Sequence, residues 1–581
     1  MLMKKFVLTA AAALASFLVS GAPETTKVLH IVTTGDVHGS FFARPYTGTR
    51  TKTSLMSVKH YVDSLRQAVG EENVLLLDAG DVLQGDNAAF YFNTLAAAEP
   101  HIYPRLAAAM GYDAVAVGNH DIEAGHQVYD RVARELQEQG IPFLAANALK
   151  PDGTPYFTPC TIVEKAGLKV AVLGYTNANI SNWLAPEKWE GITFLPIGDL
   201  VQSQVDAIRK AADPDVVVVL AHTGTGVGSD ASAESEGETV FDSLRGVQLF
   251  VCAHDHRPCV DKREGRALVN GGARAGYVTH STVTVTARGR RRVGTPQVDA
   301  ETVRLDKNAV DKDLEERFRP EFEAVKAFTV QPVCRIQSPL ETRRAFCGMS
   351  DYLNLIHTVQ LSVPEAQISF AAPLTYNGRV AAGELVYNDL FTIYPFENQL
   401  YMVLMQGSEV VRYLEESYDA WIQDGADHVL RIVNAPDPRT GALRWSFVGR
   451  TYNFDSAGGL RYTVDVTRPK GSRVKVESLA DGTEFNPDVW YNVMMTSYRV
   501  SGGGGLLQKA TLQSKEEIEE RVMEKYPEIR DIIYDYLQKH PVLEPSAIYN
   551  PRVVGSWEFV PSELAAPAIG RDMDLLFPPR H

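Results

Sequence analysis

Between residues 27 and 302 one pattern repeats: a short apolar run ends in Gly, Asp, Asn or His, and a stretch with helical spacing follows. The runs include VLHIVTTGDVHG, NVLLLDAGDVLQGD, YDAVAVGNHDIEAG, PDVVVVLAHTGTG and VQLFVCAHDHRP. Such runs are typical of strands buried on both faces, and their alternation with helices predicts an α/β domain with covered sheets. Polar residues at the strand ends indicate the rim of the sheet, where ligands bind in open α/β folds.

A second unit with its own strands is predicted after a charged helical stretch at residues 311–328, which Pro320 interrupts. Its strand-like runs are AQISFAAPL, LYMVLMQG, LRYTVDVTRP and WYNVMMTSYRV, and a long helix is predicted at residues 515–538. We therefore divide the chain into a leader (1–22), a first domain (25–305), a linker with a helix (306–345), a second domain (346–541) and a tail (542–581). The tail is rich in Pro, Ala and aromatic residues, and we expect it to pack on the surface or to be partly disordered.

The leader has the layout of a cleaved secretory signal. Lys4 and Lys5 precede an apolar run over residues 6–19 that ends in small residues at 20–22. The run is short for a membrane span, and the alternative is an anchored N-terminal helix. We expect an exported protein, periplasmic or extracellular, without a stable membrane anchor.

Length, charge and cysteine content narrow the class of protein. The 581 residues exceed what one hydrophobic core serves, and 45% hydrophobic with 22% charged residues is typical of a folded protein. The net charge of −15, with no long basic run, argues against a nucleic-acid duplex as partner but allows a small anion at a local cationic centre. Five cysteines are too few for a disulfide framework, and pairings Cys334–Cys347 and Cys252–Cys259 both stay open.

Seven polar residues share one position, directly after a strand-like run. They are Asp36, His38, Asp81, Asn119, His222, His254 and His256. Imidazole and carboxylate in these proportions suit Zn²⁺, Mn²⁺ or Fe rather than Ca²⁺. Seven ligands are too many for one tetrahedral ion but suit two ions that share a bridging carboxylate. Each residue alone has a structural explanation, as a turn or a core histidine, but the ordered set predicts a two-metal centre.

The motifs GDVHG, GDVLQGD, GNHD, AHTG and AHDH, in this order, resemble those of the calcineurin-like metallophosphoesterases. With the second domain, the chain resembles the secreted 5'-nucleotidase family as far as about Leu507. That family includes 5'-nucleotidases, UDP-sugar hydrolases and 2',3'-cyclic-nucleotide 2'-phosphodiesterase/3'-nucleotidases. The resemblance implies an α/β fold class, with an N-terminal β-sandwich flanked by helices, a linker helix and a C-terminal α/β nucleotide-binding domain.

The same resemblance implies roles for the residues of the first domain. Asp36, His38, Asp81 and His256 would hold one metal, and Asp81, Asn119, His222 and His254 the other, with Asp81 as the bridge. His120 would face the substrate phosphate as a general acid or a stabiliser of developing charge. The family usually has an Asp three residues after this His to orient it; here Glu123 has that place, and Asp121 competes for the role. Ala253 replaces a usual Gly, which should matter only if its φ is positive.

Substrate choice is expected from the second domain. Tyr452 and Tyr498 each lie near a glycine-rich turn, and two aromatic rings on opposite loops can hold a nucleotide base. The resemblance implies such a pair of rings, with Phe454 as the alternative for the first. Arg379 and Asn398 match polar substrate-binding positions loosely, and Arg379 has the alternative of a solvated loop residue.

One departure from the family concerns the substrate. Where 5'-nucleotidases typically have GGDG, this chain has four glycines, with Gly504 in place of the Asp that contacts ribose hydroxyls. YNFD and YRVSGGGG resemble the cyclic-phosphodiesterase branch more closely. This departure favours 2',3'-cyclic and 3'-nucleotides over 5'-nucleotides.

The sequence therefore predicts an exported enzyme that hydrolyses small-molecule nucleotide phosphoesters with two divalent ions and a metal-activated water. One alternative is a hydrolase of UDP-sugars or of non-nucleotide phosphoesters. Another is a nucleotide-binding or surface protein that has lost catalysis. The sequence leaves the metal identity, the base preference and the oligomeric state open.

Overall fold

The computed structural model describes residues 24–578 except 48, 185, 228–233, 289–290, 397, 424–427 and 437–441. The predicted leader at residues 1–22 lies outside the described residues. The chain divides into two compact units, Met1–Lys326 and Ala327–His581. Among the described helices, none combines the length and the apolar character that crossing a membrane requires.

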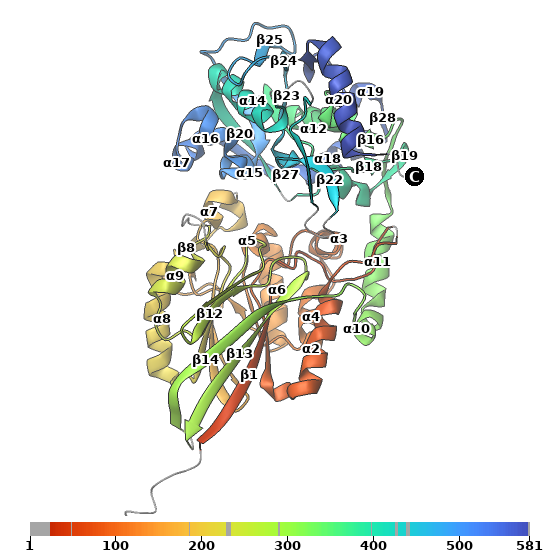
Figure 1. Cartoon of the computed structure of the whole chain (residues 1–581). Helices are drawn as coiled ribbons and strands as arrows, with labels where there is room; N and C mark the ends of the chain where they lie inside the picture. Colours follow the sequence, from red (N-terminus) through yellow and green to blue (C-terminus); the bar gives the residue numbers. More distant parts are fainter. Residues whose placement is uncertain are drawn as a thin grey trace, which may run out of the picture. The chain divides into compact units, whose positions relative to one another are not determined.

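Unit 1 contains two six-stranded sheets (Figure 1). The first has the order β14 (Arg291–Arg304), β13 (Tyr277–Arg288), β1 (Glu24–Thr34), β2 (Val74–Asp78), β3 (Ala114–Ala116) and β4 (Phe143–Leu144). The second has the order β11 (Cys259–Arg263), β12 (Arg266–Asn270), β10 (Leu249–Cys252), β9 (Val216–Ala221), β7 (Leu168–Tyr175) and β6 (Cys160–Lys165).

The two sheets of unit 1 pack face to face, and helices cover their outer faces. One buried cluster joins Ile31 and Leu77 of the first sheet to Val172 and Val218 of the second. Helices α2 (Leu55–Val69), α4 (Ile102–Met110) and α6 (His126–Glu138) pack on the first sheet, and α8 (Ile197–Ala212) and α9 (Gly237–Ser243) pack on the second. The predicted β-sandwich flanked by helices is confirmed.

The strand directions gather the polar motifs at one rim of each sheet. Strands β1 to β4 run parallel to one another, as do β7, β9, β10 and β12. The carboxyl ends of parallel strands lie at the same edge of a sheet, so the segments that follow β1, β2 and β3, and those that follow β9 and β10, come together there.

The predicted connector helix is two helices, α10 (Lys312–Arg317) and α11 (Arg319–Thr329), because Pro320 lies in the first turn of α11, where a proline is tolerated. Unit 2 has a five-stranded sheet of order β23 (Ser456–Gly458), β17 (Ile368–Ala371), β26 (Trp490–Thr496), β20 (Gln399–Gln406) and β27 (Val522–Glu528). Helix α12 (Asp351–Leu361) contacts β17 and β23, and α14 (Gly407–Trp421) contacts β20 and β23.

Smaller sheets complete unit 2. Among the described residues, two of them have three strands, in the orders β19 (Gly383–Val386), β15 (Pro332–Ile336), β28 (Val542–Leu543) and β25 (Val474–Leu479), β24 (Leu460–Asp465), β29 (Gly555–Val560). The other two are pairs, β16 (Leu340–Glu341) with β18 (Arg379–Val380) and β21 (Ile432–Pro436) with β22 (Leu443–Phe447). Figure 1 labels β16, β18, β19, β22, β24, β25 and β28 of these sheets.

Two expectations about the C-terminal part were wrong. The single helix predicted at residues 515–538 is α17 (Lys515–Glu519), strand β27 and α18 (Ile529–Gln538), because Pro527 cannot lie inside a helix. The expected tail is part of the folded unit: β29 pairs in parallel with β24, and α20 (Ser562–Leu576) buries Ile569 and Leu576 in the core of unit 2.

The five cysteines are all free, so neither of the pairings left open by the sequence forms. Cys252 and Cys334 are buried, and burial raises the pKa of both thiols. Packing, rather than disulfide bonds, therefore stabilises each unit.

Candidate active site

The seven residues that follow the strand ends come together in two adjacent groups. Asp36, His38 and His256 form one group, and Asp81, His222 and His254 form the other, with one ligand atom from each residue within 4.8 Å of those of its group. Asn119 joins the second group, because its Oδ1 lies 3.1 Å from Nε2 of His222 and 2.9 Å from Nδ1 of His254. The groups adjoin, since Nε2 of His222 is 4.0 Å from Oδ1 of Asp36.

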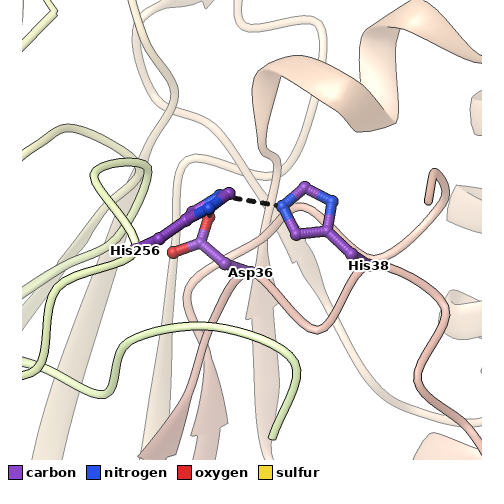
Figure 2. A group of neighbouring side chains, drawn as sticks. All are labelled: Asp36, His38 and His256. Carbon is purple, nitrogen blue, oxygen red and sulfur yellow. Dashed lines mark hydrogen bonds and ion pairs between the residues drawn. The ribbon is translucent and has the colours of Figure 1, made fainter. Parts of the chain in front are cut away.

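The first group has the spacing of ligands around one ion (Figure 2). Nε2 of His38 and Nε2 of His256 point at each other at 3.0 Å, and Oδ1 of Asp36 lies 3.7 Å from Nε2 of His256. Two nitrogen ligands of one tetrahedral Zn²⁺ lie about 3.3 Å apart, given metal–nitrogen bonds of about 2.0–2.1 Å. The donor set and its spacing therefore fit one divalent cation.

The second group also carries an orienting contact of the kind found around metal ligands. Nε2 of His222 lies 3.0 Å from Oδ2 of Asp81, and its Nδ1 lies 2.8 Å from the carbonyl oxygen of Ala79. A carbonyl oxygen only accepts, so Nδ1 donates and Nε2 faces the group. This tautomer presents the lone pair of Nε2 to a cation.

Five of the seven residues have a left-handed backbone, which is uncommon outside glycine. Their φ angles are 50° at Asp36, 47° at His38, 61° at Asp81, 72° at His254 and 58° at His256. Neighbouring loops fix these conformations: the N–H of Asp36 donates to the carbonyl of Gly80 at 2.8 Å, and that of His38 donates to the carbonyl of Asp81 at 2.9 Å. The strain is therefore concentrated where the side chains converge.

Two glycines allow the loops after β2 and β3 to approach. A Cβ at Gly80, whose φ is 95°, would lie 2.6 Å from the nitrogen of Gly118, and a Cβ at Gly118 would lie 2.1 Å from Oδ1 of Asp81. Ala253, which replaces the family's glycine, is fully buried and is not among the residues with positive φ. The departure at this position therefore introduces no backbone strain.

Burial and proximity separate the pKa values of the clustered groups. Burial raises the pKa of Asp36, whereas nearby histidines outweigh burial and hold the pKa of Asp81 below its usual value. Burial alone would lower the pKa of His222, but Asp81 and Asp36 outweigh it and raise the pKa to about 9. Burial, with His222 nearby, lowers the pKa of His254 to about 3. A cluster with such opposed shifts is typical of a functional site.

His120 lies beside the metal-type ligands, on the short helix α5 (Asn119–Glu123). Its Nδ1 is 2.5 Å from Oε2 of Glu123, and its backbone N–H donates to Oδ1 of Asp81 at 2.8 Å. Its ring centroid lies 5.4 Å from that of His38. Of the two acids that the sequence offers as the orienting partner, Glu123 is the one that contacts the ring.

Asp121 has a different environment. Its buried carboxylate accepts backbone N–H groups from Gly118 at 2.8 Å, Asp81 at 3.0 Å, Val82 at 2.9 Å and Leu83 at 2.9 Å. These four bonds fix the loop after β2 against α5. The expectation that Asp121 competes for the orienting role is therefore revised to a structural one.

Three neighbours of the cluster were not singled out from the sequence. Trp183, at the end of α7 (Ile180–Trp183), stacks on His254 with ring centroids 5.2 Å apart and planes at 13°. The carboxylate of Asp255 accepts the N–H and the hydroxyl of Thr225, both at 2.8 Å. The N–H of Arg274 donates to the carbonyl of Asp36 at 2.8 Å. Only Asp255, inside AHDH, had a signal in the sequence.

In unit 2, a buried ion pair joins the two motifs that carry the predicted aromatic rings. The guanidinium of Arg499 donates to both carboxylate oxygens of Asp455, at 2.8 and 2.9 Å. It also donates to Oδ1 of Asn453 and to the carbonyl of Tyr452, both at 2.7 Å. Asp455 holds the pKa of Arg499 above its usual value although burial opposes this. Arg499 thus fixes the segment of Tyr452 relative to that of Tyr498.

The aromatic residues predicted to hold a base, Tyr452, Tyr498 and Phe454, differ in ring arrangement and in exposure. Tyr452 and Tyr498 have ring centroids 6.2 Å apart but planes at 84°, and Phe396 lies edge-on to Tyr452 at 5.7 Å. The two tyrosines therefore meet edge to face, an arrangement that aromatic quadrupoles favour, and not as parallel plates. Tyr498 is 36% exposed, whereas Phe454 is fully buried and stacks on Trp421. Phe454 is a core residue, so the alternative that it is the first ring was wrong.

The remaining predicted residues of unit 2 lie in different settings. Arg379, on β18, is 60% exposed and pairs with Glu341 at 3.0 Å. Asn398 directly precedes Gln399, whose N–H donates to the hydroxyl of Ser497 at 3.2 Å, next to Tyr498. Gly504 has a φ of 72°, and a Cβ there would lie 2.7 Å from Oδ1 of Asn453 and 2.9 Å from Nη1 of Arg499. A side chain at 504 would therefore disturb the contacts of Arg499.

Comparisons with known families and proteins agree with this geometry. Residues 328–511 match the family model described as "5'-nucleotidase, C-terminal domain", and residues 30–259 match "Bacterial capsule synthesis protein PGA_cap". A 2',3'-cyclic-nucleotide 2'-phosphodiesterase/3'-nucleotidase of Haemophilus influenzae is 24% identical over 92% of this chain and 87% of that protein. A 5'-nucleotidase of Vibrio cholerae is 24% identical over 69% of this chain and 78% of that protein. The chain spans only 39% of a trifunctional nucleotide phosphoesterase of Bacillus subtilis, at 22% identity.

Solved structures share the fold. A 5'-nucleotidase precursor from Thermus thermophilus has a TM-score of 0.56 at 20% identity, covering 92% of this chain and 99% of that one. The NAD nucleotidase of Haemophilus influenzae has a TM-score of 0.56 at 16% identity, covering 92% of this chain and 100% of that one. The chain is thus similar over most of its length to a 2',3'-cyclic-nucleotide 2'-phosphodiesterase/3'-nucleotidase and a 5'-nucleotidase, and its residues 328–511 match the 5'-nucleotidase C-terminal domain.

Proposed function

We propose that the chain is an exported, metal-dependent hydrolase of nucleotide phosphoesters with two divalent cations at its centre. The carrying observation is the pair of adjacent ligand groups, which together place seven metal-type side chains at one rim of the sheets of unit 1. The names of relatives that align over most of the chain support nucleotides as the substrate class. The apolar leader supports export, to the periplasm or beyond the cell.

The two ligand groups would each hold one cation. Asp36, His38 and His256 would hold the first and Asn119, His222 and His254 the second, with Asp81 shared between them. When bound, two divalent cations supply an activated water near neutral pH and stabilise charge on the phosphoryl oxygens. Zn²⁺, Mn²⁺ and Fe all suit these donors.

His120 is the group we assign to proton transfer. The carboxylate of Glu123 accepts a hydrogen bond from Nδ1–H, which leaves Nε2 to act on the substrate, and the protonated ring can donate from Nε2 to the leaving oxygen or stabilise phosphoryl charge. Asp121 acts indirectly, since its four backbone contacts keep the loop that carries Asp81 in place. The intact His120–Glu123 contact argues against a binding protein that has lost catalysis.

Nucleoside recognition is assigned to unit 2. Tyr452 and Tyr498 offer aromatic surface for a base, held in position by Arg499, and Asn398 adds a polar group next to the segment of Tyr498. Arg379 would reach an anionic substrate only by leaving Glu341. Gly504 leaves no carboxylate to contact free ribose hydroxyls, and this favours 2',3'-cyclic and 3'-nucleotides, whose ribose 2' or 3' oxygens carry the phosphate.

Product analysis by chromatography, with phosphate release measured in parallel, on four substrates tests the proposed function. We expect the purified protein to hydrolyse 2',3'-cyclic AMP and 3'-AMP faster than AMP or UDP-glucose, and to lose all activity on chelation until Mn²⁺ or Zn²⁺ is added back. Turnover of AMP alone would contradict the preference for 2',3'-cyclic and 3'-nucleotides that we attribute to Gly504. Absence of turnover with all four substrates in the metal-loaded protein would reject a nucleotide hydrolase.

Replacement of His120 tests its assignment to proton transfer. His120→Ala should retain both metals and lower kcat by about 10²–10⁴, the usual share of a general acid. His126→Ala is the matched control, because His126 contacts Tyr129 and Asp130 on α6 and should leave kcat close to that of the wild type. Loss of metal from the His120 variant, measured by elemental analysis, would show that His120 is a ligand.

Metal uptake should depend on pH through His222. In the metal-free protein the pKa of His222 is raised to about 9. The charged ring therefore stabilises the folded state fully below the unfolded pKa of about 6.5, and this stabilisation is lost as the pH rises through 9. A ligand must give up this proton, so Mn²⁺ affinity should rise between about pH 6 and pH 9, with proton release on binding. Calorimetry in buffers of different ionisation enthalpy measures this release; uptake without proton release would contradict the assignment.

Tyr498 should matter only for substrates that carry a base. Tyr498→Ala should raise KM for 2',3'-cyclic AMP about 10-fold or more, since stacking on an aromatic ring is worth about 1–3 kcal/mol per base. It should spare turnover of bis(p-nitrophenyl) phosphate. Leu564→Ala, at a 56% exposed position on α20, is the control. An equal loss on both substrates would remove the stacking role.

A further inference from the structure

A basic cleft lies in unit 1, outside the ligand groups described above. It has a volume of about 750 Å³, which falls within the range of small-molecule sites. Two segments form its walls, residues 50–53 and residues 304–307, with Gly276 and Tyr277 between them. Four of the lining side chains are cationic (Arg50, Lys52, Arg304 and Lys307), and Asp306 is the one acidic residue of the lining. This is a local excess of positive charge on a chain with a net charge of −15.

Three of these cations are available to a ligand. Lys52 pairs with Asp86, but the side chains of Arg50, Arg304 and Lys307 have neither an ion pair nor a hydrogen bond to the described part of the chain, and all three are exposed. The carboxylate of Asp306 is engaged by Asn308, whose backbone N–H and amide group donate to it at 2.9 and 3.1 Å. The cleft therefore presents unpaired cations with little internal neutralisation, which suits an anion with several oxygens.

Both walls of the cleft are connected to the predicted metal ligands. The hydroxyl of Thr53 donates to the carbonyl of Arg274 at 3.1 Å, and the N–H of Arg274 donates to the carbonyl of Asp36 at 2.8 Å. On the same wall, Lys52 pairs with Asp86, whose N–H donates to the carbonyl of His38 at 3.0 Å. The second wall joins the same loop, since the N–H of Leu305 donates to the carbonyl of Gly276 at 3.1 Å. The segments that line the cleft are thus linked, through Arg274 and Asp86, to the segments that carry Asp36 and His38.

We propose that this cleft binds phosphate groups that a nucleotide substrate carries in addition to the one being cleaved. Short oligonucleotides and nucleoside bisphosphates are the substrate class that this chemistry selects. The inference rests on the proposed function, and it adds a charge-based preference that the aromatic residues of unit 2 do not provide. Because the cations are exposed, their attraction weakens as the salt concentration rises.

A pair of substrates that differ by one phosphate tests the cleft. We compare kcat/KM for adenosine 3',5'-bisphosphate and for the dinucleotide pApAp with kcat/KM for 3'-AMP. In the metal-loaded wild type, both ratios to 3'-AMP should exceed one. The triple variant Arg50→Gln, Arg304→Gln and Lys307→Gln should reduce these ratios about 10-fold, because exposed ion pairs are individually weak but act together here. The preference should also fall between low and high salt.

Arg134→Gln is the matched control, since Arg134 is an exposed arginine of α6 outside the cleft and should leave both ratios unchanged. If both ratios stay the same in the triple variant while 3'-AMP is still hydrolysed, the proposed role of the cleft is overturned and the proposed hydrolase activity is not. Free tripolyphosphate could inhibit the wild type but not the triple variant, with the kcat/KM ratios unchanged. This result would show that the cleft binds a free anion, and it would overturn the role of the cleft in substrate binding. Absence of nucleotide turnover in the wild type would overturn the proposed function and the inference together.

Discussion

The site in unit 1 depends on one electrostatic constraint: acidic and imidazole side chains converge at the rim of two buried sheets, where Asp36, Asp81 and His222 are fully buried. Five of the seven residues adopt left-handed backbone conformations there. Such conformations persist only where the surroundings fix them. Backbone hydrogen bonds between the loops after β1 and β2, and glycines at 80 and 118, provide that support. The arrangement is explained by a divalent cation, which would balance the buried carboxylates and accept the imidazole lone pairs.

In each unit, a buried carboxylate that accepts hydrogen bonds from several N–H groups fixes the segments of the site. In unit 1, Asp121 accepts four backbone N–H groups and keeps the loop of Asp81 beside His120. In unit 2, Asp455 accepts hydrogen bonds from Nε and Nη2 of Arg499, and Nη2 also donates to the backbone carbonyl of Tyr452. In both units a buried carboxylate thus fixes the segments that carry the side chains we assign to the site.

Much of unit 1 could be predicted from the sequence, because buried parallel strands have a strong apolar pattern and the ligands follow them at once. The pattern failed where a single residue overrode it: Pro527 turns a predicted helix into a strand and two shorter helices. Phe454 appeared equivalent to Tyr452 but lies in the core against Trp421. The Arg499–Asp455 pair and the stacking of Trp183 on His254 join residues far apart in the chain, so no local pattern indicates them.

The central proposal is that two cations would occupy the two ligand groups, with Asp81 shared between them. Anomalous diffraction from crystals of the Mn²⁺- or Zn²⁺-loaded protein measures this directly. The account predicts two peaks about 3.5–4 Å apart, one beside His38 and His256 and the other beside His222 and His254. A single peak in the metal-saturated protein, or peaks away from these side chains, would contradict it.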